Sequence, residues 1–122
     1  MRKLTRTTDP AQICRITLEE AAELVPTPDG KRSATVFEHG SLQVKLYAPR
    51  GTDPQQPHTR DEAYVVAQGT GWFVNGPHRH AFAPHDVLFV KAGVVHRFDE
   101  FSDDFRVWVF FYGPEGGEID AA

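Results

Sequence analysis

The strongest constraint on the fold is a period-two alternation of apolar and polar residues that begins at Ser33 and continues to Tyr112. Successive side chains of an extended strand point to opposite faces, so the alternation predicts strands with one buried face. Gly or Pro turns separate the runs, which occupy residues 33–38, 42–48, 63–68, 72–75, 79–83, 86–90, 96–101 and 105–112. We therefore predict an all-β, antiparallel barrel, either closed or sandwiched.

The last of these runs, FRVWVFFY, is apolar on both faces. It is predicted to be a central strand, or a strand with one face against a partner subunit. Before the strands, residues 16–26 (ITLEEAAELVP) predict one short helix, because Thr17 and Glu20 can form a capping box and Pro26 can end the helix. The polar residues 1–12 and the acidic, glycine-rich residues 113–122 are expected to be loose tails of a single domain, 1–122.

Composition excludes several classes of partner. A chain of 122 residues with a formal net charge of -4 and no basic stripe is not expected to bind nucleic acid. The single cysteine, Cys14, excludes an intrachain disulfide and suits a reducing cytosol, where we expect it to be an idle thiol. Since the N-terminus lacks a signal peptide and no stretch reaches the ~18 apolar residues of a membrane span, we expect a soluble, cytoplasmic protein.

A candidate metal site surrounds His58. If the chain is extended there, Gln56, His58 and Glu62 share one face and Asp61 points away. A second imidazole is available from His96, which follows the turn KAGVV. Two imidazoles and one carboxylate with open positions form the facial set of non-haem Fe(II) oxygenases, and the same donors hold Mn, Ni, Co or Zn. On spacing alone, a surface histidine in an ion pair remains an alternative reading.

Two motifs of the chain resemble those of the cupin superfamily. The first runs from Gly51 through His58 and Glu62 to Gly69, and the second is HDVLFVKAGVVH, which ends at His96. The resemblance implies a jelly-roll barrel with a divalent metal held by His58, Glu62 and His96. Together with the surplus of apolar strand faces, it also implies a homodimer.

Three positions depart from the cupin motifs. Gln56 stands where the family has its first histidine, His85 where it has a glycine, and Lys91 where it has a proline. Replacing the glycine and the proline affects turn shape more than chemistry. Gln56 leaves three outcomes open: its amide oxygen binds the metal, three residues and water hold the metal, or the barrel binds its ligand without metal.

Further residues are candidates for a substrate pocket or are excluded from the site. Arg60 can face the barrel and hold an anionic group, although a solvent-facing or Asp61-paired arginine is the competing interpretation. Strand parity places four aromatic side chains along the cavity, namely Tyr47, Tyr64, Phe98 and Trp108. The second His-x-His pair, His78 and His80, follows a turn and is expected to face solvent, and no role is assigned to His39 or His85.

These features lead to three functional hypotheses. The first is a metal-dependent oxygenase acting on a chelating small molecule, and the second is a metal-dependent sugar or keto-acid isomerase. The third is a non-catalytic small-ligand or sensor barrel, which Gln56 favours because a three-ligand site binds metal less firmly. A widely shared fold does not by itself assign a reaction.

Overall fold

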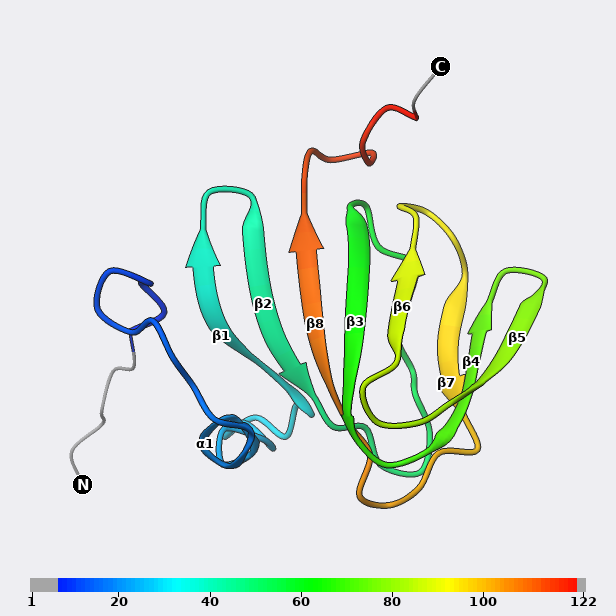
Figure 1. Ribbon diagram of the computed structural model, residues 1–122, viewed down its shortest axis with the longest axis horizontal. Coiled ribbons are helices and arrows are strands. Elements are labelled where there is room, and N and C mark those ends of the chain that lie inside the picture. The colour runs from blue at the N-terminus through cyan, green and yellow to red at the C-terminus, as the bar shows by residue number, and fades with distance from the viewer. Residues whose placement is uncertain (1–6, 121–122) are drawn as a thin grey trace.

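Eight strands and one short helix make up the regular structure of residues 7–120, which are the residues described in this computed structural model (Figure 1). The helix α1 covers Leu18–Ala22. The strands are β1 (Ser33–His39), β2 (Leu42–Tyr47), β3 (Asp61–Gln68), β4 (Gly71–Asn75), β5 (His78–Phe82), β6 (Val87–Val90), β7 (His96–Asp99) and β8 (Arg106–Tyr112). The all-β prediction is confirmed, and each strand falls on a predicted run.

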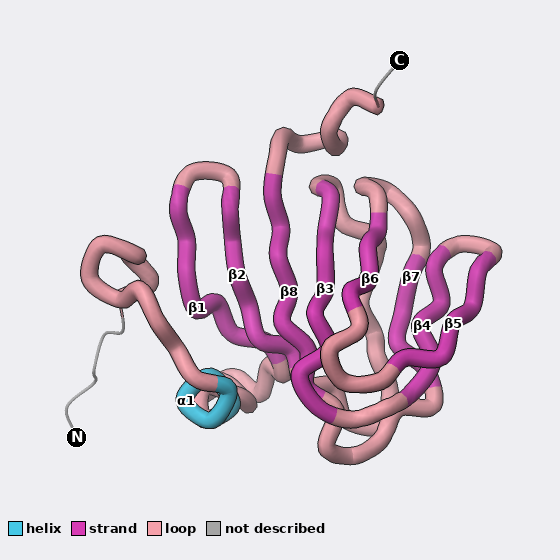
Figure 2. The backbone as a smooth tube through the Cα atoms, viewed as in Figure 1, coloured by secondary structure: helices cyan, strands magenta, loops and turns pink. Residues whose placement is uncertain are grey.

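The strands form two antiparallel sheets that face each other, as Figures 1 and 2 show. One sheet has the order β1-β2-β8-β3-β6 and the other has the order β5-β4-β7. Strand β8 lies between β2 and β3, which confirms the prediction of a central strand. Both of its faces are apolar because one packs in the core between the sheets and the other packs in the cluster that includes the helix.

The inner faces of the two sheets enclose an aromatic core. Tyr64 and Val109 come from the five-stranded sheet, and Phe73 and Phe98 come from the three-stranded sheet; each is at least 96 % buried. The rings of Tyr64 and Phe98 meet edge to face with centroids 4.9 Å apart, a favoured aromatic geometry. This core fixes the spacing of the sheets, and therefore the spacing of any residues that they jointly contribute to a site.

The N-terminal helix covers part of the outer face of the larger sheet. The Thr17 hydroxyl accepts a hydrogen bond from the Glu20 amide, and the Glu20 carboxylate accepts one from the Thr17 amide, both at 3.1 Å. The predicted capping box is therefore present, although the helix ends at Ala22, earlier than expected. Five residues are too few for an independent helix, so its stability comes from packing Ala21 against Val36 and Leu46.

The described part of the C-terminal segment is docked, contrary to the expectation of a loose tail. Both carboxylate oxygens of Asp61 accept backbone hydrogen bonds, from Ala92 at 3.0 Å and from Glu118 at 2.8 Å. The Gly116 amide also donates to the Thr59 carbonyl at 2.6 Å. At the other end, Thr8 accepts a hydrogen bond from Glu38 in β1, while residues 1–6 and 121–122 lie outside the described part.

Between Thr7 and Asp120, no helix has the length and apolar character needed to span a membrane.

Candidate metal centre

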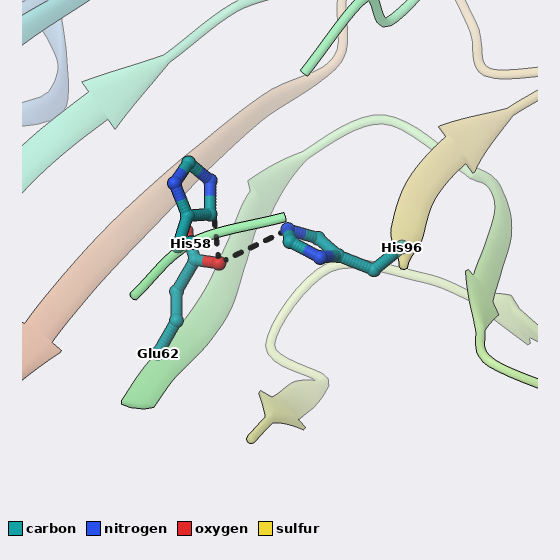
Figure 3. Close-up of side chains that lie close together, drawn as sticks. All are labelled: His58, Glu62 and His96. Carbon is teal, nitrogen blue, oxygen red and sulfur yellow. Dashed lines mark ion pairs between the residues drawn. The ribbon is translucent and has the colours of Figure 1, made fainter. Parts of the chain in front are cut away.

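Two side chains four residues apart, His58 and Glu62, converge with the distant His96 inside the barrel (Figure 3). Glu62 lies on β3, His96 begins β7, and His58 comes from the loop that precedes β3. The Glu62 Oε1 atom lies 3.1 Å from Nε2 of His96 and 3.8 Å from Nε2 of His58. One ligand atom from each residue lies within 4.8 Å of the others. The structure therefore brings together the two imidazoles and the carboxylate that the sequence singled out.

Backbone and side-chain hydrogen bonds orient both imidazoles. The Gly93 amide donates to the His58 carbonyl at 2.7 Å, which ties the His58 loop to the turn before β7. Gly93 has φ +81, a conformation that favours glycine, so the motif glycine is required by this turn. The His96 Nδ1 atom lies 2.8 Å from the Val94 carbonyl, and in neutral histidine this contact places the proton on Nδ1 and the lone pair on Nε2.

These three residues, His58, Glu62 and His96, are called the cluster below. The cluster is rich in hydrogen-bond acceptors and poor in hydrogen-bond donors. Glu62 is 2 % exposed, and its Oε1 atom has no well-aligned hydrogen bond, although it lies beside two Nε2 atoms. A buried carboxylate oxygen without a donor is costly unless a cation neutralises its charge. The donor set therefore fits a bound cation better than it fits a satisfied core histidine.

The two imidazoles differ in proton affinity. Burial lowers the pKa of His58 below its ordinary value, and the charges of His96 and Lys45 add to this effect while Glu62 opposes it. For His96, burial is also the largest influence and opposes protonation, but the Glu62 carboxylate and the Val94 carbonyl outweigh it and raise the pKa. His96 is thus the imidazole that shares charge most directly with Glu62.

The fourth member of the cluster is Gln55, and the assignment of Gln56 was wrong by one residue. Gln56 is exposed, whereas the Gln55 Oε1 atom lies 3.2 Å from Nε2 of both His58 and His96 and accepts a hydrogen bond from the Tyr64 hydroxyl at 3.3 Å. The Gln55 amide nitrogen donates to Asp53 at 2.6 Å, which turns the amide oxygen toward the imidazoles. Strand parity failed here because the segment is a loop.

Asp53, which the sequence reasoning missed, fastens this loop to both sheets. Its carboxylate accepts hydrogen bonds from the Tyr47 hydroxyl on β2 and, at 2.8 Å, from the Phe98 amide on β7. It also holds the Gln55 amide. Burial, with the Asp53 carboxylate adding to it, raises the pKa of Tyr47 far above its ordinary value, so the phenol keeps its proton and donates a hydrogen bond to Asp53. No local pattern marks Asp53, because its partners are distant in the chain.

A cavity of about 170 Å³ adjoins the cluster. Its lining joins three members of the cluster, Gln55, His58 and Glu62, to side chains from β2 and β8, which include Lys45, Tyr47, Val109 and Phe111. Tyr47 is therefore where strand parity placed it. Lys45 was missed, although it has the same parity as Tyr47 on β2.

The other pocket candidates lie elsewhere. Tyr64 is fully buried behind the cluster, and Phe98 is a core residue. Trp108 pairs across the strands with Leu46, whose side chain lies on the outer face of the sheet. Trp108 therefore also faces outward, where it packs in the cluster that includes the helix α1. Arg60 donates through Nε to the Gly113 carbonyl at 3.1 Å and does not line the cavity. None of these four residues lines the cavity, so all four are corrections to the predicted pocket.

The remaining histidines stay outside the cluster. His78 and His80 are exposed on β5 with ring centroids 6.2 Å apart, and His39 is exposed at the end of β1. His85 is exposed and has φ +78, so it occupies the motif's glycine position in the left-handed conformation that a glycine would adopt without strain. Asp61 points away from the cluster as predicted, but it is buried and not in solvent.

Comparisons with known proteins agree with this architecture. An uncharacterized protein from Streptomyces coelicolor, SCO3923, is 40 % identical over 77 residues, which cover 62 % of this chain and 73 % of that protein. A cupin-2 domain containing protein from Shewanella frigidimarina has a TM-score of 0.64 at 17 % identity, covering 84 % of this chain and 98 % of that one. KdgF from Halomonas has a TM-score of 0.57 at 16 % identity, with 67 % and 80 % covered.

The structural similarities, at such low identity, concern the fold. The family relationship comes from the sequence, because residues 43–111, more than half of the chain, match the Cupin domain family (Cupin_2). The structure agrees with that match in its strand order, in its two facing sheets and in the histidine on the loop before β3. This chain belongs to the cupin family.

Proposed function

We propose that this cupin binds a divalent metal ion through His58, Glu62 and His96, with the Gln55 amide oxygen as a fourth donor, and acts on a small molecule held in the adjoining cavity. The observation that carries the proposal is the buried Glu62 Oε1 atom, which has no aligned hydrogen bond and lies next to two imidazole Nε2 atoms. Imidazole and carboxylate donors suit Fe, Mn, Ni, Co or Zn, and the amide oxygen adds a harder donor.

Among metal-dependent reactions, we favour oxygenation of a small molecule that enters the cavity. A facial set of two histidines and one carboxylate leaves coordination positions open, and such a metal supplies Lewis-acid chemistry or, as iron, redox chemistry. The protein contributes orientation and shielding. Tyr47 lines the cavity with its phenol held protonated, and Phe111 packs edge to face on His58, with centroids 4.8 Å apart, and shields one side of the ring.

A non-catalytic ligand-binding barrel is the competing proposal, and the observation in its favour is Gln55. An amide oxygen is a weaker donor than an imidazole nitrogen for a transition metal, so the site would bind such an ion less firmly. The two proposals differ in oxygen consumption: only the enzyme consumes O₂ when the metal and a chelating substrate are both present.

The first experiment is elemental analysis of untagged protein, before and after reconstitution with Fe(II), Mn(II) or Ni(II). We expect close to one metal per chain in the wild type, a marked decrease in Glu62→Gln, and none in a His58→Ala/His96→Ala double variant. A His78→Ala/His80→Ala variant is the matched control, because it removes an exposed imidazole pair from outside the cluster. Metal retained by the first double variant, or absent from reconstituted wild type, would contradict the proposal.

We also propose that a second copy of the chain covers the outer face of β6. Val87 and Phe89 are 71 % and 46 % exposed there. Val87 pairs across the strands with Val65 of β3 and Phe89 pairs with Ala63, so the exposed apolar surface continues from β6 onto β3. An exposed apolar sheet face of this kind favours association. Light scattering should give a dimer mass for the wild type and a monomer mass for Val87→Asp/Phe89→Asp. A wild-type monomer would contradict this arrangement.

A further inference from the structure

The cavity contains one cationic side chain, Lys45, whose position follows from strand alternation. On β2, Val44 and Leu46 face the helix layer, so Lys45 and Tyr47 face the barrel interior. Lys45 is half-buried and pairs across the strands with Val109 of β8, which pairs in turn with Tyr64 of β3. The backbones of β2 and β3 are thus two strand spacings apart, roughly 10 Å. Lys45 and Glu62 line opposite sides of one cavity.

The Lys45 ammonium group has no carboxylate partner among residues 7–120. None of the ion pairs in this part of the chain includes Lys45. Neither carboxylate of the site pairs with Lys45, because Asp53 binds Tyr47, Gln55 and the Phe98 amide, while Glu62 lies beside the imidazoles. The charge of Lys45 reaches the cluster, where it helps to lower the pKa of His58. A half-buried cation without a partner is available to a ligand.

The charge of the site changes sign when a divalent ion binds. With neutral imidazoles, the ammonium group of Lys45 and the carboxylates of Asp53 and Glu62 leave one negative charge, which favours the entry of a cation. A divalent ion turns this into one positive charge, which a carboxylate neutralises. A phosphate monoester, with a charge of about −1.5 to −2, would overcompensate. The rest of the lining is largely apolar, including Val109, Phe111 and Pro54.

We infer that the ligand of this cavity is a small organic acid whose carboxylate pairs with Lys45 while its apolar body lies between Val109 and Phe111 and its other end faces the His58–Glu62–His96 cluster. This inference rests on the proposed function, since the positive charge of the cavity depends on the metal. Anion and metal binding are therefore coupled: the metal-loaded protein binds the acid more tightly, and the acid in turn strengthens metal binding.

The test uses Co(II)-loaded protein titrated by calorimetry with benzoate and with benzamide, two probes of similar shape that differ in charge. We expect benzoate to bind at least about tenfold more tightly than benzamide, because a charge-assisted hydrogen bond is lost with the neutral probe. Lys45→Met should weaken benzoate binding about tenfold, and Lys45→Arg should largely restore it. Lys31→Met, which removes an exposed lysine paired with Asp29, should behave as wild type.

A second readout separates this role from a structural one. Because Lys45 repels a cation, Lys45→Met should bind Co(II) as tightly as the wild type or several-fold more tightly. If Lys45 were merely structural, the same substitution would weaken both Co(II) binding and benzoate binding. Co(II) binding without a preference for benzoate, or an unchanged benzoate affinity in Lys45→Met, would overturn the inference and leave the metal proposal standing. Wild type that binds no Co(II) would overturn both.

Discussion

Replacing Asp61 with asparagine should loosen both the C-terminal segment and the turn before β7. In the wild type, one carboxylate oxygen accepts from Ala92 at 3.0 Å and the other from Glu118 at 2.8 Å. An asparagine retains one acceptor and directs an amide N–H₂ at the other backbone N–H. Hydrogen bonds to a charged acceptor contribute about 1.5–3 kcal/mol each, and the exposed Glu118 amide can recover part of its loss from water. We therefore expect the free energy of unfolding to fall by about 2 kcal/mol.

Urea denaturation and amide hydrogen exchange measure the two parts of this effect. The urea midpoint measures the loss of global stability. Faster hydrogen exchange at the Ala92 and Glu118 amides measures the local loss of their hydrogen bonds to residue 61. Asp120→Asn is the matched control, because it removes an exposed carboxylate whose ion pair with Lys91, at 2.9 Å, should contribute less than about 1 kcal/mol. Unchanged exchange at both amides in Asp61→Asn would refute the argument that this carboxylate holds the two segments.

The same carboxylate predicts a pH dependence. The backbone hydrogen bonds from Glu118 and Ala92 lower the pKa of Asp61 below its ordinary value. A group whose pKa is lower in the folded state contributes stability above its unfolded pKa of about 3.9, and this contribution is lost as the pH falls through the folded pKa. The difference between wild type and Asp61→Asn should therefore be constant near neutral pH and shrink below about pH 4. A difference that persists at lower pH would mean that charge is not involved.

Two glycine-related predictions concern the turns. His85→Gly should stabilise the protein by about 0.5–1 kcal/mol in thermal unfolding, because His85 has φ +78, while His85→Ala, which keeps the strained backbone, should change little. Gly69→Ala should cost about 3 kcal/mol or more, because a Cβ there would lie 2.7 Å from the Phe105 Cα atom and the backbone has φ +90. Gly40→Ala, with φ +56 and open space around it, should cost only about 1 kcal/mol, and an equal cost at both positions would exclude the clash as the cause.

The strands were predictable because burial of one face leaves a period of two in the sequence, and β2 and β3 show it clearly. The same rule placed Tyr47 at the cavity, since β2 is a regular strand. It failed at Gln56, because residues 53–58 form a loop in which neighbouring side chains do not alternate between two faces. The sequence also did not determine which face of β8 points into the barrel. Because β8 is apolar on both faces, its pattern does not show on which face Trp108 lies.

The docked segment and the role of Asp53 could not be predicted for a different reason. The Asp61–Glu118 and Asp53–Phe98 hydrogen bonds join residues that are 57 and 45 positions apart. Such contacts depend on the packed barrel, and nothing in the local composition of the tail or the loop specifies them. The convergence of His58, Glu62 and His96 also depends on the fold, but the two motifs marked those residues in the sequence.

The cluster lies at one end of the strands, so the donor atoms and part of the surface beside them belong to different segments and can change independently. Glu62 is paired with the last residue of β6, Val90, and His96 is paired with the last residue of β4, Asn75, so both lie where strands meet turns. Strands hold Glu62 and His96, whereas the loop before β3 holds His58 and is tied to the turn after β6 by the Gly93 amide. The β4–β5 turn at Gly76 borders the same end of the strands (Figure 1). The β4–β5 turn carries no donor atom, so an insertion there leaves the segments that hold the donor atoms unchanged while it alters the surface beside the cluster. Related barrels with the same donor atoms can thus differ in the length of this turn and in the surface that surrounds the cluster.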